Sequence, residues 1–91
     1  MILIKKLIED SNQGIQSFIL LEDVECYIQM DDFTFEKIDS EPLKKGDVYD
    51  GEIIYKRNNQ YYLDLGIDRK FRQKVFIPII SESSTITIEK R

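Results

Sequence analysis

Residues 43–66, LKKGDVYDGEIIYKRNNQYYLDLG, predict a β-hairpin at the centre of the fold. Residues 48–57 and 60–65 are rich in β-branched and aromatic side chains, which favour strands. Asn58 and Asn59 between them are a turn signal, because asparagine tolerates the left-handed backbone that tight turns need. The other segments are therefore expected to be strands arranged around this hairpin.

The two-residue turn fixes which side chains of the hairpin face each other. We predict that Ile54 pairs with Leu63, and that both face the core. The opposite face should carry a polar and aromatic set, with the two tyrosines paired across the strands: Tyr55, Arg57, Gln60 and Tyr62.

Residues 15–30 predict a second hairpin, with a tight turn at Glu22 and Asp23. This register places apolar residues opposite each other on one face, as a half-buried antiparallel hairpin requires. The expected pairs are Leu21 with Val24, Ile19 with Cys26, Ser17 with Ile28 and Ile15 with Met30. Glu-Asp is a poor two-residue turn, because the favoured turns need positive φ, so a longer loop with a shifted register is the alternative.

The remaining segments complete an all-β pattern. Residues 2–8 predict a strand or a helical turn, and 31–42 predict a short helix or a strand over 34–38. Residues 75–80 predict a buried strand with Pro78 at its end or at an edge, and 85–88 a last strand followed by frayed residues 89–91. We therefore expect one domain over residues 1–91, a small OB-like or related β-barrel of six to seven short antiparallel strands, with one short helix as an option.

Composition removes several kinds of chemistry. The chain has no histidine, the commonest general base, and one cysteine, too few thiolates for a zinc site. We expect Cys26 to be a buried, inert thiol. We expect no catalytic residues, no cofactor and no metal site. No apolar run is long enough to cross a membrane, and no signal peptide is evident, so a cytoplasmic protein is predicted.

Charge is distributed unevenly along the chain. Residues 1–43 hold three lysines and ten acids, whereas residues 44–75 hold eight basic residues and five acids. This asymmetry predicts an acidic part and a mildly basic part, unless the strands interleave and mix the signs.

Residues 43–82 resemble the RNA-binding repeat of ribosomal protein S-one, an OB-fold family. The resemblance lies in Gly46-Asp47 with Gly51, in Leu63-Asp64-Leu65-Gly66, and in Phe76-Ile77-Pro78-Ile79 followed by Ser81-Glu82. Asn59 and Gln60 stand where that family has Phe-Gly, and the resemblance covers less than half of the chain. It implies an OB-like barrel that binds single-stranded RNA.

Two binding functions follow as hypotheses. The first is a protein-binding module, such as an inhibitor, immunity factor or small subunit, that contacts its partner through six acids: Glu22, Asp23, Glu25, Asp31, Asp32 and Glu36. The alternative for these acids is that they only keep the protein soluble. The second is single-stranded RNA or DNA binding, in which aromatic platforms and cations act together: Tyr55, Arg57, Tyr62, Arg69, Lys70, Arg72 and Lys74. The alternative for the tyrosines is packing against a neighbouring strand with the hydroxyls at the rim.

Overall fold

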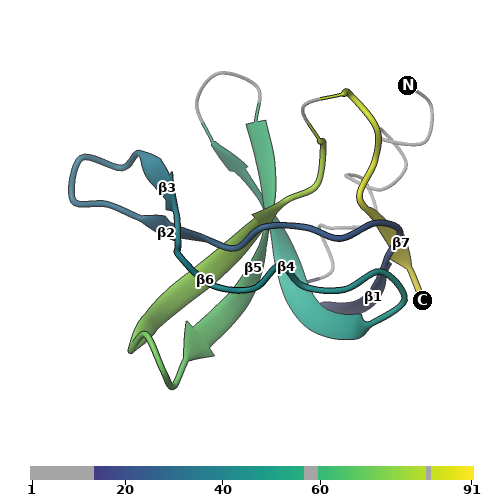
Figure 1. The fold of residues 1–91 in the computed structure, drawn as a ribbon, viewed down its shortest axis with the longest axis horizontal. Helices are drawn as coiled ribbons and strands as arrows, with labels where there is room; N and C mark the ends of the chain where they lie inside the picture. Colours follow the sequence, from purple (N-terminus) through teal and green to yellow (C-terminus); the bar gives the residue numbers. More distant parts are fainter. Residues whose placement is uncertain (1–13, 57–59, 82) are drawn as a thin grey trace.

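Seven antiparallel strands form one sheet in the computed structural model, which describes residues 14–56, 60–81 and 83–91, and side chains for all of these except 55 and 56 (Figure 1). The sheet order is β3-β2-β6-β5-β4-β1-β7. The strands are β1 (Gln16–Leu20), β2 (Tyr27–Gln29), β3 (Phe35–Lys37), β4 (Val48–Lys56), β5 (Gln60–Asp68), β6 (Gln73–Pro78) and β7 (Ile88–Lys90).

The predicted all-β, barrel-like fold is confirmed. Within the described ranges there is no helix, and the sheet coils around a core without closing, since its end strands β3 and β7 are not hydrogen-bonded neighbours. For residues 31–42, the strand alternative holds and the helix does not, because Phe35–Lys37 pairs with β2. The prediction for residues 2–8 lies outside the described residues. No helix in the described part of the chain has the length and apolarity to cross a membrane.

Strand β4 changes partner at Gly51. Its first half pairs with β1, ending with Gly51 opposite Gln16, and its second half pairs with β5, beginning with Glu52 opposite Asp64. A Cβ atom on Gly51 would lie 2.6 Å from the carbonyl oxygen of Asp64 and 2.9 Å from the side chain of Leu63. Glycine therefore lets β5 approach β4 at the point where β4 passes from one neighbour to the other.

A bulge bends strand β5 four residues after Tyr62. The register against β6 shifts between Asp64 and Ile67, and Gly66 in this interval has a φ of 81°. The Gly66 N–H donates to Asp64 Oδ1 at 2.8 Å. Such bulges increase the local twist of a sheet, which here helps it to coil.

The predicted hairpin over residues 15–30 is wrong. Strand β1 pairs with β4 and β7, and β2 pairs with β3 and β6, so the chain crosses the molecule between them (Figure 1). The non-glycine residues with positive φ in the described chain are Phe33, Arg72 and Ser84. Glu22 and Asp23 therefore do not form a tight turn, and the chain reverses instead at residues 30–34.

The face assigned to β1 is reversed as a result. Phe18 and Leu20 are buried, whereas Ile15, Leu21 and Met30, which the predicted register placed on the apolar face, are exposed. Pairing with β4 rather than with residues 24–30 decides which side chains of β1 turn inward. The core consists of Phe18, Leu20, Val24, Cys26, Ile53, Leu63, Val75, Ile77, Ile79 and Ile88. The predicted burial of Cys26 is confirmed.

The central hairpin is confirmed, but its register is one residue away from the prediction. Leu63 pairs with Ile53 instead of Ile54, so Tyr55 lies opposite Tyr61 and Ile54 lies opposite Tyr62. Three residues separate the paired Lys56 and Gln60, where a two-residue turn was expected. The Asn58-Asn59 turn itself lies outside the described residues. Leu63 faces the core as predicted and is fully buried, whereas the prediction for Ile54 is wrong, because Ile53 packs in the core in its place.

The C-terminal strands are partly as predicted. Residues 75–77 are buried, and Pro78 ends β6. The prediction that residues 89–91 fray is wrong. Glu89 and Lys90 belong to β7 and pair with β1, and the Arg91 N–H donates to the Ser17 carbonyl at 3.0 Å.

We predict that Gly51→Ala destabilises the fold by about 3 kcal/mol, because the new methyl group meets the backbone of β5. Gly46→Ala is the control. Gly46 lies in a turn just before β4, with a φ of 92° and no atom within 4 Å of the position of a Cβ, so its substitution should cost only about 1 kcal/mol of backbone strain. Urea unfolding of both variants measures the difference. Equal losses would show that the Gly51 contact is not a constraint.

Candidate binding surfaces

Four aromatic rings from four strands attach the β2–β3 hairpin to the sheet. The Phe35 and Tyr62 rings stack with centroids 4.0 Å apart at 13°. Phe35 meets Phe76 edge-on at 5.0 Å, and Tyr27 meets Tyr62 edge-on at 6.4 Å. Each such pair contributes roughly 0.5–1.5 kcal/mol beyond the area that it buries. This aromatic cluster (Tyr27, Phe35, Tyr62 and Phe76) therefore fixes the position of the hairpin.

Tyr62 is packed inside this cluster rather than displayed on the surface. Its side chain is 7% exposed, and one face of its ring is covered by Phe35. Its hydroxyl donates to Gln60 Oε1 at 2.9 Å. Burial, together with the nearby Tyr27, raises the pKa of Tyr62 above its usual range. A nucleobase could stack on this ring only if Phe35 moved away.

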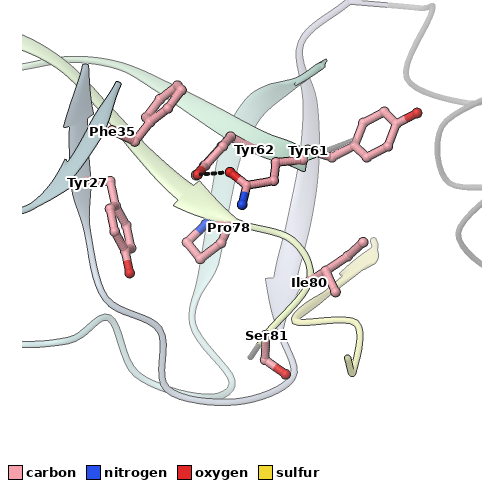
Figure 2. A pocket seen from close by; sticks show the side chains of 8 residues that line it. Tyr27, Phe35, Tyr61, Tyr62, Pro78, Ile80 and Ser81 are labelled. Atoms are coloured by element: carbon pink, nitrogen blue, oxygen red, sulfur yellow. Dashed lines mark hydrogen bonds between the residues drawn. The ribbon is translucent and has the colours of Figure 1, made fainter. Parts of the chain in front are cut away.

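Beside the cluster lies a groove of about 470 Å³, which we call the aromatic groove (Figure 2). In Figure 2, Tyr27 and Phe35 lie on one side of Pro78, and Tyr61 extends away from the other rings. None of the described residues that line it carries a charge. They are Tyr27, Phe35, Gln60, Tyr61, Tyr62, Pro78, Ile80 and Ser81.

The turn of the β2–β3 hairpin, residues 30–34, displays two large apolar side chains. Phe33 is 78% exposed and Met30 is 40% exposed. We call this turn the hairpin tip, and in Figure 1 it projects away from the rest of the sheet. The Met30 N–H donates to the Thr34 carbonyl at 2.7 Å, and the Phe33 N–H donates to the Met30 carbonyl at 2.9 Å. Both apolar side chains are thus held on an ordered turn.

Asp32 stabilises this turn. Its Oδ1 accepts hydrogen bonds from the Thr34 N–H at 3.1 Å and from the Thr34 hydroxyl at 2.5 Å. These bonds lower the pKa of Asp32. The side chain thus stays a carboxylate and adds its charge to the surface around Phe33.

Phe33 occupies a backbone conformation that costs free energy. Its φ is 67°, in the left-handed region that glycine and asparagine favour. For other residues this conformation costs roughly 1–2 kcal/mol. Since the ring is mostly exposed, contacts within the chain offset little of this cost.

The structure brings together three of the six acids predicted to contact a protein. Asp31, Asp32 and Glu36 line an open hollow of about 570 Å³, which we call the acidic hollow, together with Met30, Thr34 and Phe35. Phe35 also lines the aromatic groove, so this residue belongs to both linings.

The other three predicted acids lie on the segment that crosses between β1 and β2. Asp23 forms an ion pair with Lys44 at 3.8 Å and accepts the Lys45 N–H at 2.8 Å. Glu22 accepts a hydrogen bond from the Thr85 hydroxyl at 3.3 Å, and Glu25 is half-buried. Glu22 and Asp23 thus make contacts within the chain.

Three of the cations predicted to bind phosphate lie far from Tyr62. Arg69, Lys70 and Arg72 are exposed on the β5–β6 turn, residues 69–72, which we call the basic turn. Strand β5 separates it from Tyr62 by about 20 Å, at the usual rise of a strand. Lys74 forms an ion pair with Asp64 at 3.4 Å. The Tyr55 side chain and Arg57 lie outside the described residues. Tyr62 and the three cations of the basic turn therefore do not form one site.

Five residues of these surfaces are absent from the predicted sites: Tyr27, Met30, Phe33, Phe35 and Phe76. Tyr27, Phe35 and Phe76 meet only because β3 curls over β5, which depends on long-range pairing. Phe33 and Met30 had a local signal, since they flank two aspartates at a chain reversal, where polar residues are usual.

The described residues contain no group of three or more cysteine, aspartate or glutamate side chains that could hold a metal ion. Comparison of the chain with protein-family models, curated proteins and solved structures finds no match.

We predict that stability falls as the pH rises through about 10. Burial raises the pKa of folded Tyr62, so the unfolded chain releases its phenolic proton first and gains stability relative to the folded chain. Tyr62→Phe should weaken this pH dependence while costing about 1 kcal/mol at neutral pH, because it loses the bond to Gln60. Tyr49, whose pKa burial also raises, should retain part of the dependence. Urea unfolding between about pH 8 and 11 tests this, and an unchanged slope in the variant would contradict it.

Proposed function

We propose that this protein is a non-catalytic binding module that acts through a protein partner, and that the hairpin tip is the principal contact. The observation that supports this proposal is the exposure of Phe33 and Met30 on one ordered, projecting turn. Single buried aromatic side chains contribute much of the affinity of many interfaces. Phe33 is placed to enter an apolar socket on a partner.

The charge around the tip indicates the kind of partner. Residues 25–41 contain six acids and one lysine. Asp31 and Asp32 belong to the tip, and Glu36 lies on the adjacent strand β3. An acidic rim around an apolar anchor complements a socket with a basic rim, and such complementarity mainly raises the association rate and the specificity. The proposed partner surface is therefore apolar at its centre and basic at its edge.

The backbone of Phe33 supports a binding role over a merely structural one. Strained conformations at exposed positions are frequent at sites of function. A glycine at this position would relieve the strain and lose little packing, because the ring is mostly exposed. What the phenylalanine would supply in return is contact with another molecule.

Single-stranded nucleic acid is the alternative ligand. The exposed cations of the basic turn favour it, and the distance of that turn from Tyr62 disfavours it. If nucleic acid is the ligand, the partner contact should depend on Arg69, Lys70 and Arg72 and should be indifferent to Phe33.

We predict that Phe33→Gly raises the free energy of unfolding by about 1 kcal/mol, by removing left-handed strain, and abolishes capture of the partner. The measurement pairs urea unfolding with a pull-down from the native host, using the protein as bait at low and at moderate salt. Capture by the unchanged protein should weaken as salt rises, because the rim charges are exposed.

Ile67→Ser is the matched control, because Ile67 is a comparably exposed apolar residue, 73% exposed, on β5. It should capture the same partner as the unchanged protein. Equal capture by Phe33→Gly and the unchanged protein would refute the role of the tip. Loss of capture in both variants would show that capture depends on exposed apolar surface in general rather than on the tip, which also refutes it.

A further inference from the structure

We propose that the aromatic groove receives a proline-rich segment with flanking basic residues, carried by the protein partner. This inference rests on the proposed function, since it identifies a second part of the partner and its chemistry. It assigns a role to residues that the hairpin tip does not use: Tyr27, Phe35, Gln60, Tyr62, Pro78 and Ser81.

The lining matches the chemistry of a polyproline helix. Such a helix has no internal hydrogen bonds, and its carbonyl groups point outward. Grooves that bind it combine aromatic walls, which pack against proline rings, with a few hydrogen-bond donors. Here Tyr27 and Phe35 provide walls on one side of Pro78 (Figure 2). The Tyr27 hydroxyl and the amide of Gln60, whose oxygen already accepts from Tyr62, supply donors.

The groove is also built to keep its shape. Phe35 is stacked on Tyr62 and meets Phe76 edge-on, so the wall formed by the hairpin is held by ring contacts. A preformed groove and a preformed polyproline helix both lose little conformational entropy on binding. An ordinary flexible segment would lose more.

Charge selects between ligand classes. Among the residues that the structure describes, the lining contains no cation to hold a phosphate. Phe35 lines both the groove and the acidic hollow, where Asp31, Asp32 and Glu36 would repel a nucleic acid backbone and attract arginine or lysine. The prolines of a proline-rich segment would pack in the aromatic groove, and its flanking basic residues would pair with the acids of the acidic hollow.

Fluorescence anisotropy with short labelled probes tests the inference. The main probe is a hexaproline peptide flanked by one arginine at each end. The comparison probes are the same peptide flanked by glutamates, a glycine–serine peptide flanked by arginines, and a thymidine oligonucleotide. We expect the main probe to bind at least about tenfold more tightly than each of the others, because only it offers both the rings and the cations.

Three variants locate the binding. Phe35→Leu should weaken binding of the main probe about tenfold by removing the wall. Tyr27→Phe, which keeps the ring and deletes one donor, should weaken it about fivefold. Glu36→Lys should abolish the preference for arginine over glutamate flanks. Ile67→Ser, distant from the groove lining, should bind as the unchanged protein does.

Several results would overturn the inference. Equal binding of the proline and glycine–serine peptides would remove the role of the rings, and tighter binding of the oligonucleotide would make nucleic acid the ligand. Unchanged affinity in both Tyr27→Phe and Phe35→Leu would place the peptide elsewhere. If no peptide binds while partner capture still depends on Phe33, the groove inference fails and the proposed function stands. If the peptide binds while capture ignores Phe33, the role of the hairpin tip fails instead.

Discussion

The close approach of β4 and β5 at Gly51 is the constraint on which the rest of the sheet depends. Strand β4 must pair with β1 over its first half and with β5 over its second half, and a side chain at Gly51 would collide with the backbone of Asp64 at the crossing point. The change of partner, followed by the Gly66 bulge in β5, lets one sheet coil around its own core. The segment from β1 to β2 then crosses the coil, contributing Val24 and Cys26 to the core on the way. This route ends at β2, the first strand of the hairpin that carries both candidate surfaces.

The hairpin is short, and its stability comes from rings rather than from its length. A three-residue pair of strands is marginal by itself. Stacking of Phe35 on Tyr62 and its edge contact with Phe76 fasten β3 to the sheet. Phe35 is also a lining residue of both the aromatic groove and the acidic hollow. Phe35 therefore links the attachment of the hairpin to the shape of the groove and the position of the tip. The exposed Phe33 is consequently presented on a held element, although its own backbone is strained.

The local parts of this fold could be predicted from the sequence, and the long-range parts could not. Alternation and turn chemistry located the central hairpin, the buried strand over residues 75–77, and the core positions Leu63 and Cys26. The predicted pairing within residues 15–30 is wrong because the two neighbouring apolar segments match each other in sequence pattern alone. In the structure β1 pairs with β4 and β7, and β2 pairs with β3 and β6. The prediction of a tyrosine platform likewise rests on local sequence pattern alone. Tyr62 carries the signature of an exposed aromatic on a polar face, yet the ring that covers it comes from β3, whose path no local pattern specifies.

The central claim is that a partner protein contacts the hairpin tip. Chemical-shift mapping of the isotope-labelled protein, titrated with the captured partner, tests it most directly. If the tip is the contact, the largest amide shifts should fall in residues 30–36, with smaller shifts at Tyr27 and Gln60 along the aromatic groove. Amide shifts concentrated in the basic turn, residues 69–72, without shifts in the hairpin tip, would contradict it. The basic turn would then be the preferred candidate for the binding site.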